Sequence, residues 1–266
     1  MSALLFFDID GTLLTLDDRH YIPDSAKEAL REARANGHRI FINTGRVKTA
    51  IDRELLEFGF DGLICGCGTY IEYEGQELFH RSIPQKTCLE YARILEKAGF
   101  QAVYEGKERL FLSGDHEKVP FFKFIYEYFT RNSEYPIERP EHPEFGFDKF
   151  TAVRMPDSDM EVFQSVFGSE FTMMPHTDRV YEMVPKGFSK ATGMQYLMDF
   201  LGVSVENCYA FGDSVNDMEM LRFAGHAVAM GNAPEKVRGI AEYCTTEVME
   251  DGIQGALLHY GLILGR

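Results

Sequence analysis

The 266-residue sequence predicts an α/β protein: a Rossmann-like, doubly wound parallel sheet whose two halves are separated by an inserted α+β unit. Two patterns predict this. Short apolar runs alternate with amphipathic helical segments at both ends of the chain, as in doubly wound sheets. Between about Pro84 and Pro185 the order changes to helices and hairpin-like strand pairs. We therefore expect a discontinuous core domain of residues 1–82 and 188–266, and an inserted cap domain over 83–187.

The N-terminal part of the chain supplies the first half of the predicted sheet. Its opening apolar run is typical of a fully buried parallel strand that delivers polar residues to its carboxyl end. The first helix has alanine and leucine at helical spacing and ends at Asn36-Gly37. The expected elements are strands at 3–7, 38–42 and 62–65 and helices at about 23–35 and 47–58.

The middle of the chain supplies the inserted unit. One of its helices is rich in aromatic residues, which we expect in the core of that unit, and a loop rich in proline and glutamate follows it. The expected helices cover about 85–98, 118–130 and 158–167. The expected strands cover 101–104, 109–112, 150–155, 170–174 and 179–184.

After Pro185 the alternation of helix and strand returns. The expected helices cover about 190–201, 218–224 and 234–241, and the expected strands 207–211, 226–230 and a short segment near Cys244. The two α/β stretches are most simply halves of one sheet. Ligands of such sheets bind outside the carboxyl ends of the strands.

Charge and composition limit the partners. Lys and Arg number 27 against 42 Asp and Glu, a net charge of −15, which disfavours nucleic acid and anionic lipid as partners. No apolar run approaches the ~18 residues that a membrane span needs. The first residues do not resemble a signal peptide. Five cysteines form no paired zinc or disulfide pattern, which favours a reducing, cytoplasmic location.

The first predicted strand ends in a group of residues suited to phosphoryl chemistry. Asp8 and Asp10 are separated by one residue, and Gly11 and Thr12 form a turn that we expect to offer backbone N–H groups to a phosphate. One carboxylate can attack phosphorus while its neighbour moves a proton for the leaving group and later for water. The sequence thus indicates a phosphate site at this strand end.

The second half of the chain adds two more carboxylates. Asp213 ends an apolar strand, and Asp217 lies four residues later on the same face of one helical turn, with Asn216 beside it as a ligand or supporting residue. If both halves form one sheet, these carboxylates meet Asp8 and Asp10. Their mutual repulsion calls for a hard divalent cation such as Mg²⁺.

Two further polar residues complete the predicted site. Lys190 begins a helix after Gly187-Phe188-Ser189, where its ammonium can join the nucleophile to a phosphoryl oxygen. Thr44 follows the second strand and can offer its hydroxyl and N–H to another oxygen. Both would bind the anionic group that the carboxylates alone would repel.

These stretches resemble the haloacid dehalogenase (HAD) superfamily. Within it, the whole chain is similar to the Cof-like sugar-phosphatase branch, which has a large type II (IIB) α/β cap between the second and third motifs. The matching motifs run in the family's order: Asp8-Ile9-Asp10-Gly11-Thr12-Leu13, Thr44-Gly45-Arg46, Pro185-Lys186-Gly187-Phe188-Ser189-Lys190 and Gly212-Asp213-Ser214-Val215-Asn216-Asp217-Met218.

The resemblance implies a role for each matched residue. Asp8 would be the nucleophile and Asp10 the general acid and base. Mg²⁺ would be held by Asp8, the Asp10 backbone carbonyl and Asp213, with Asn216 and Asp217 in support. The residues expected to bind the phosphoryl group or the substrate are Gly11, Thr12, Thr44, Gly45, Arg46, Lys190 and Asn216. One position departs from the family: Cys67-Gly68-Thr69 stands where Asn-Gly-Ala is usual, which puts substrate orientation or cap contact in doubt.

We therefore predict a cytoplasmic, Mg²⁺-dependent phosphatase that hydrolyses a small phosphorylated metabolite, most plausibly a sugar phosphate, through an aspartyl phosphate. We expect a monomer or weak homo-oligomer without nucleic-acid or membrane partners. Two alternatives stay open: a phosphosugar mutase of the same superfamily and a catalytically silent sugar-phosphate-binding protein. A signalling receiver is disfavoured, because it needs neither a cap nor a second Asp two residues after the nucleophile.

Overall fold

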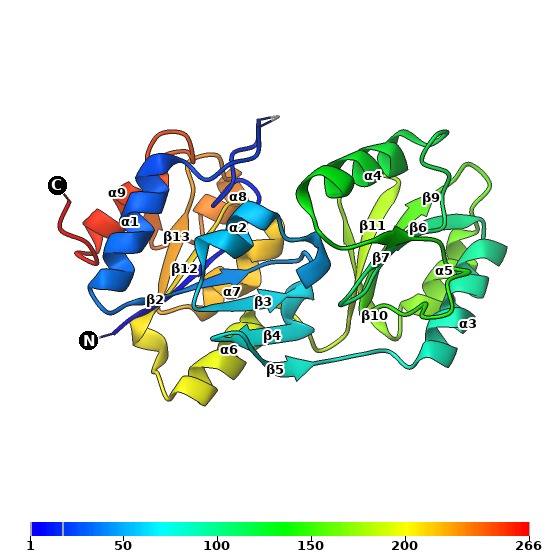
Figure 1. The fold of residues 1–266 in the computed structure, drawn as a ribbon, viewed down its shortest axis with the longest axis horizontal. Coiled ribbons are helices and arrows are strands. Elements are labelled where there is room, and N and C mark those ends of the chain that lie inside the picture. Colours follow the sequence, from blue (N-terminus) through cyan, green and yellow to red (C-terminus); the bar gives the residue numbers. More distant parts are fainter. Residues whose placement is uncertain (1, 18, 266) are drawn as a thin grey trace. The chain divides into compact units, whose positions relative to one another are not determined.

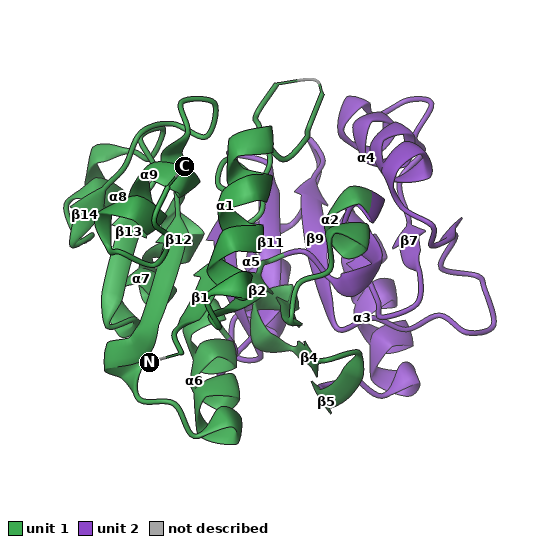
Figure 2. Cartoon of the chain, turned by 60° about the vertical axis from the view of Figure 1, so that its left-hand side comes forward, with its two compact units in different colours: residues 1–45, 54–79, 189–266 green, residues 46–53, 80–188 purple. Residues whose placement is uncertain are grey.

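The computed structural model describes residues 2–17 and 19–265, and its elements form two compact units (Figures 1 and 2). Unit 1 consists of residues up to 45, 54–79 and from 189 onward, and unit 2 of 46–53 and 80–188. The boundaries at 79/80 and 188/189 lie within three residues of those expected from the sequence. Segment 46–53 was expected in the core domain, but it packs with unit 2.

Unit 1 is built on one eight-stranded sheet to which both α/β stretches contribute. In order across the sheet, its strands are β14 (Tyr243–Cys244), β13 (His226–Ala229), β12 (Cys208–Gly212), β1 (Leu4–Phe7), β2 (Arg39–Asn43), β3 (Gly62–Cys65), β4 (Tyr70–Tyr73) and β5 (Gln76–His80). The strands from β14 to β3 are mutually parallel, and β4 is antiparallel to β3. The predicted fold class is confirmed.

Helices cover both faces of this sheet, so every side chain of β1 is buried. Leu4 and Phe6 pack in one apolar cluster with residues of α6 and α7, such as Met194 and Leu221. On the other face, α1 packs against α9 and β2. The helices of unit 1 are α1 (Asp24–Ala35), α2 (Arg53–Phe58), α6 (Lys190–Leu201), α7 (Met218–Phe223), α8 (Glu235–Arg238) and α9 (Gly252–His259).

Unit 2 is built on a six-stranded, mainly antiparallel sheet. In order, its strands are β10 (Phe171–Pro175), β11 (Val180–Pro185), β9 (Lys149–Arg154), β6 (Phe100–Glu105), β7 (Leu110–Leu112) and β8 (Ile137–Glu138). Its helices are α3 (Gln85–Lys97), α4 (Pro120–Asn132) and α5 (Met160–Phe167). An aromatic-rich core joins α3 and α5 to one face of the sheet. A smaller cluster around Phe122 joins α4 to the same strands.

The structure differs from the sequence-based expectations in three respects. The predicted helix at 47–58 is a 3-10 turn at Lys48–Ala50 followed by α2, because segment 46–53 packs on unit 2 rather than continuing a helix. The aromatics of α4 were expected in the core, but among them only Phe122 is fully buried, and Phe124 is 56% exposed. Strands β4, β5 and β8 and helix α9 were not expected.

No helix within the described part of the chain is long and apolar enough to cross a membrane.

One face of the unit 2 sheet carries a buried ionic cluster. The Lys149 ammonium donates to Glu182 at 2.5 Å and lies 3.2 Å from Glu105, and the His176 ring contacts the second oxygen of Glu182 at 3.0 Å. Burial raises the pKa of Glu105. Burial also opposes ionisation of Glu182, but Lys149 and His176 outweigh it and hold its pKa at about 2. The two glutamates therefore differ in acidity through their partners.

Replacing Glu182 by Gln tests this cluster. We expect the Glu182→Gln variant to lose about 3 kcal/mol of stability at pH 7, because it removes the charge that Lys149 and His176 share and leaves Lys149 with its longer contact to Glu105. The folded pKa lies below the unfolded value of about 4.3, so this stability is present above that pH and is lost as the pH falls toward 2. Chemical denaturation of wild type, Glu182→Gln and the exposed control Glu90→Gln across this range measures it. Parallel pH profiles of wild type and Glu182→Gln would contradict it.

Candidate active site

The site lies at the carboxyl edge of the unit 1 sheet. Asp8 directly follows β1, Asp213 directly follows the neighbouring β12, and Thr44 follows β2 on the other side of β1. The chain leaves β1 toward β2 but returns through β12 on its opposite side, so the strand order reverses at this point. Such a switch point leaves a crevice where doubly wound sheets bind ligands.

Three of the predicted acidic residues meet there. Carboxylate oxygens of Asp8, Asp213 and Asp217 all lie within 4.8 Å of one another. Their residues are only 5%, 8% and 0% exposed. Asp10 is half-buried and lies outside this group of three, although its charge contributes to raising the pKa of Asp8. The sheet therefore brings both halves of the sequence into one acidic site.

Lys190 places a cation inside this acidic group. Its ammonium donates to Asp8 Oδ1 and to Asp217 Oδ1, each at 2.5 Å, and the residue is 1% exposed. Lys190 is the first residue of α6, and the capping box of Ser189 and Thr192 fixes where that helix begins. The Asn43 side chain donates to the Lys190 carbonyl at 3.1 Å. The start of α6 is thus held at the end of β2.

The electrostatics of the site follow from burial. Burial raises the pKa of Asp8, and the Asp217 charge raises it further, whereas Lys190 lowers it. Burial and the Asp217 charge likewise raise the pKa of Asp213 to about 7. Burial opposes the charge on Lys190, but Asp217 and Asp8 outweigh it and raise its pKa. Lys190 is therefore protonated, whereas burial and mutual repulsion oppose full ionisation of Asp8 and Asp213 in the absence of a further cation.

The turn after β1 supports Asp213 rather than offering its N–H groups to a ligand. The Gly11 N–H donates to the Leu14 carbonyl and the Thr12 N–H to the Ile9 carbonyl, so the expectation that both serve a phosphate is corrected. The Thr12 hydroxyl donates to Asp213 Oδ1 at 3.3 Å. Gly11 has φ +78°, and a Cβ there would lie 2.4 Å from Asp213 Oδ2. Glycine is required because the carboxylate lies against the turn.

Asn232 is a site residue that the sequence reasoning missed. Its amide donates to Asp213 Oδ2 at 3.1 Å and to the Gly11 carbonyl at 3.0 Å, which joins the turn after β1 to the carboxylate after β12. It follows β13 as a polar residue at a strand end. Asp8 and Asp213 were chosen because they are polar residues that follow predicted parallel strands, and the same criterion would have selected Asn232.

The loop after β12 orients Asp217. The second carboxylate oxygen of Asp217 accepts from the Asp213 N–H at 3.0 Å and from the Ser214 N–H at 2.9 Å. The Asn216 side chain accepts from the Ser214 hydroxyl at 2.5 Å. Asn216 therefore stabilises the loop that carries the two carboxylates.

The predicted phosphate loop after β2 is divided between the two units. Thr44 is buried in unit 1, where its N–H donates to the Ile64 carbonyl at 2.9 Å and its carbonyl accepts from the Cys67 N–H at 3.0 Å. Gly45 is the last residue of this segment in unit 1, and Arg46 belongs to unit 2. Cys67, which departs from the family motif, is buried with φ +55°. Asn adopts this left-handed region more readily than Cys.

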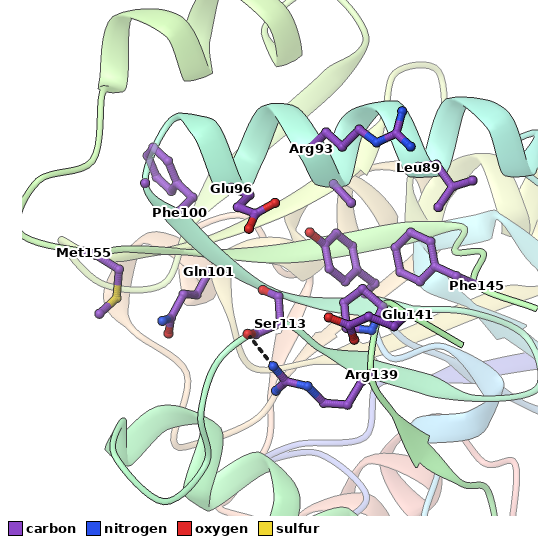
Figure 3. Close-up of a pocket in the computed structure, with 14 residues that line it drawn as sticks. Leu89, Arg93, Glu96, Phe100, Gln101, Ser113, Arg139, Glu141, Phe145 and Met155 are labelled. Atoms are coloured by element: carbon purple, nitrogen blue, oxygen red, sulfur yellow. Dashed lines mark hydrogen bonds between the residues drawn. The ribbon is translucent and has the colours of Figure 1, made fainter. Parts of the chain in front are cut away.

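A cavity of about 460 Å³ lies elsewhere, within unit 2 (Figure 3). It is bounded by α3, β6 and the loop around Glu141, and Tyr104 and Phe145 form part of its floor. The Arg139 guanidinium at its edge donates to the carbonyls of Ser113 and Gly114. None of the site residues predicted from the sequence lines it.

The acidic group fits a hard divalent cation. Three carboxylates share one ammonium, so Lys190 can neutralise only one of the three negative charges that the site carries when all of them are ionised. Carboxylate oxygens are the ligands that Mg²⁺ prefers. The loops after β1 and β12 bring these oxygens close together.

A family model for haloacid dehalogenase-like hydrolases matches residues 5–257. The chain belongs to this family. The family and the enzyme class predicted from the sequence, a phosphatase of this family, are confirmed.

Similar proteins cover nearly the whole chain. YkrA of Bacillus subtilis, named only as a candidate phosphatase, is 28% identical over 98% of this chain and 99% of its own length. YcsE of the same organism, a 5-amino-6-(5-phospho-D-ribitylamino)uracil phosphatase, is 29% identical over 97% of this chain and 96% of its own. The solved structure of BT4131, a HAD subclass IIB sugar phosphatase, has a TM-score of 0.82 at 31% identity and covers 98% of this chain and 100% of its own.

Replacing Gly11 by Ala tests the packing of the turn against Asp213. Positive φ makes an alanine strained by about 1–2 kcal/mol at either Gly11 or the matched control Gly37, where a Cβ would contact nothing. We expect Gly11→Ala to cost about 1–3 kcal/mol more than Gly37→Ala, because its Cβ must displace the carboxylate. Chemical denaturation of both variants measures the difference. An equal loss of stability in the two would show that Asp213 does not lie against the turn.

Proposed function

We propose that the chain is a Mg²⁺-dependent phosphatase that hydrolyses small phosphorylated metabolites, above all sugar phosphates, through an aspartyl phosphate on Asp8. The observation that carries this proposal is the buried group of Asp8, Asp213 and Asp217 around Lys190. A nucleophilic carboxylate, a fixed ammonium and an excess of acidic ligands are together what phosphoryl transfer requires. Family membership supports the same chemistry.

In the first half of the reaction, Asp8 forms a bond to phosphorus while the bond to the leaving oxygen breaks. Asp10, two residues further along the same turn, gives its proton to that oxygen. Lys190 lowers the pKa of Asp8 against the effect of burial and offsets charge on the phosphoryl oxygens, and the Thr44 hydroxyl binds another oxygen. The Thr44 N–H, which was also expected to bind phosphate, donates to the Ile64 carbonyl instead. The nucleophile, the proton donor and the phosphate-binding groups are thus all supplied by residues at the carboxyl edge of the unit 1 sheet.

In the second half, Asp10 takes a proton from water, the water oxygen bonds to phosphorus, and the bond from phosphorus to Asp8 breaks. Phosphate leaves and both carboxyl groups return to their initial states. A Mg²⁺ ion held by Asp8, Asp213 and the Asp10 carbonyl would offset negative charge on the phosphoryl group. Asp217 and Asn216 would support that ion through the loop after β12.

Further observations support the proposed substrate class, partners and location. BT4131 is named a sugar phosphatase, and the name of YcsE describes a phosphorylated ribityl compound. The net charge of −15 disfavours nucleic acid and anionic lipid, and no disulfide joins cysteines of the described residues, which suits the cytoplasm. We propose that unit 2 is the cap domain that selects the leaving group, and that the protein is a monomer or weak homo-oligomer.

Replacing Asp8 by Asn tests the nucleophile. We expect phosphate release from sugar phosphates to fall by about a thousandfold or more, because no covalent intermediate can form. A phosphate-release assay with Mg²⁺ measures it, and the matched control is Asp178→Asn, whose side chain is 89% exposed. Undiminished hydrolysis by Asp8→Asn would refute the mechanism. Isomer formation without phosphate release in wild type would instead identify a mutase.

A further inference from the structure

Segment 46–53 is part of unit 2 through specific contacts. The Thr49 hydroxyl donates to the Gly106 carbonyl at 2.9 Å, and the Ser133 hydroxyl donates to the Thr49 carbonyl at 2.7 Å. Val47 and Ala50 pack in an apolar cluster with Leu110, Phe129 and Ile137. The segment is therefore attached to unit 2, although it lies in the chain between β2 and α2.

Arg46, Asp52 and Tyr128 form a closed triangle of hydrogen bonds, here called the arginine lock. Arg46 Nη1 donates to Asp52 Oδ2 at 2.9 Å and to the Ala50 carbonyl at 3.0 Å, and Arg46 Nη2 donates to the Tyr128 hydroxyl at 3.2 Å. That hydroxyl donates in turn to Asp52 at 2.9 Å. The guanidinium also lies over the Tyr128 ring, 5.4 Å from its centre.

The arginine lock is a strong arrangement because it is partly buried and charge-assisted. The side chains of Arg46 and Asp52 are 15% and 8% exposed. Burial raises the pKa of Tyr128 to about 12, so its hydroxyl keeps the proton that it donates to Asp52. Hydrogen bonds between charged groups are about twice as strong as neutral ones. The orientation of the guanidinium is therefore set by residues of unit 2.

The chain itself joins the arginine lock to the phosphate-binding loop. Thr44 is fixed in unit 1 by backbone hydrogen bonds to Ile64 and Cys67, and Arg46 follows it after Gly45 alone. Two residues of chain span at most about 7 Å, so the Cα atoms of Thr44 and Arg46 are close whatever the arrangement of the units. Gly45 is the residue at which the chain passes from unit 1 to unit 2 at this point.

We propose that Asp52 and Tyr128 are positioning residues which orient Arg46 for an anionic group of the substrate. This inference rests on the proposed function. An arginine held in one orientation before binding loses less side-chain entropy when substrate arrives. Neither Asp52 nor Tyr128 needs to touch the substrate.

Kinetics of Tyr128→Phe test the consequence for binding. The variant keeps the ring but removes the hydroxyl that Arg46 and Asp52 share, so we expect KM for a sugar phosphate, and the inhibition constant of inorganic phosphate, to rise about tenfold. We expect kcat to change less than about twofold, because the lost interaction stabilises the bound substrate and the transition state equally. Tyr126→Phe is the matched control, because Tyr126 lies on the same helix and stacks on His116.

A double-variant cycle separates positioning from a merely structural role. If Tyr128 acts through Arg46, Tyr128→Phe adds no loss of kcat/KM in an Arg46→Ala background. Additive losses in the double variant would overturn the proposal. A rise in KM equal to that of Tyr126→Phe would overturn it as well.

Hydrogen exchange tests the arginine lock without any assay of activity. We expect backbone amides of 46–53 to exchange about tenfold faster in Asp52→Asn and in Tyr128→Phe than in wild type, with exchange in α6 unchanged. Unchanged exchange in 46–53 would overturn the proposal whatever the kinetics show. If wild type hydrolyses no phosphate ester, the proposed function fails, and exchange still decides whether the lock exists.

Discussion

The ammonium of Lys190 between Asp8 and Asp217 is the interaction on which the site depends. Three buried carboxylates repel one another, and removing each from water is unfavourable unless a cation accompanies it. Lys190 supplies one positive charge at 2.5 Å from two of them. That charge holds the acidic group together in the free protein but does not balance it. A divalent ion, as proposed, would favour ionisation of the carboxylates that Lys190 does not neutralise, so one contact links the stability of unit 1 to its proposed chemistry.

Close packing around the carboxylates dictates several residues of the chain. Gly11 allows Asp213 to lie against the turn after β1, and a Cβ at Gly212 would lie 2.6 Å from the Cβ of Asp217. Asn232 joins the loops after β1 and β13 by donating to both Gly11 and Asp213. These residues do no chemistry themselves. They keep oxygen atoms of different loops at short range, which a divalent ion requires.

Local pattern was enough to predict the parallel strands of unit 1, most of which are apolar runs followed by polar residues. It was not enough for β4 and β5, which mix polar and apolar residues. Local pattern also predicted that Asp8, Asp213 and Asp217 lie close together, since neighbouring parallel strands end at the same edge of the sheet. Local pattern did not predict the structure of segment 46–53. Its residues have helical spacing, but the segment is not one continuous helix, because it contacts residues distant in sequence such as Leu110 and Tyr128. The roles of Gly11 and Thr12 were also mistaken, because their N–H groups are satisfied by carbonyls that only the folded turn brings near.

Calorimetric titration of the protein with Mg²⁺ tests the central claim, that the acidic group around Lys190 is a divalent-cation site. The account predicts that one Mg²⁺ ion binds each wild-type chain and that Asp213→Asn, which keeps the shape of the side chain but removes its charge, abolishes that binding. Wild-type protein that binds no Mg²⁺, or an Asp213→Asn variant that binds it as wild type does, would contradict the account.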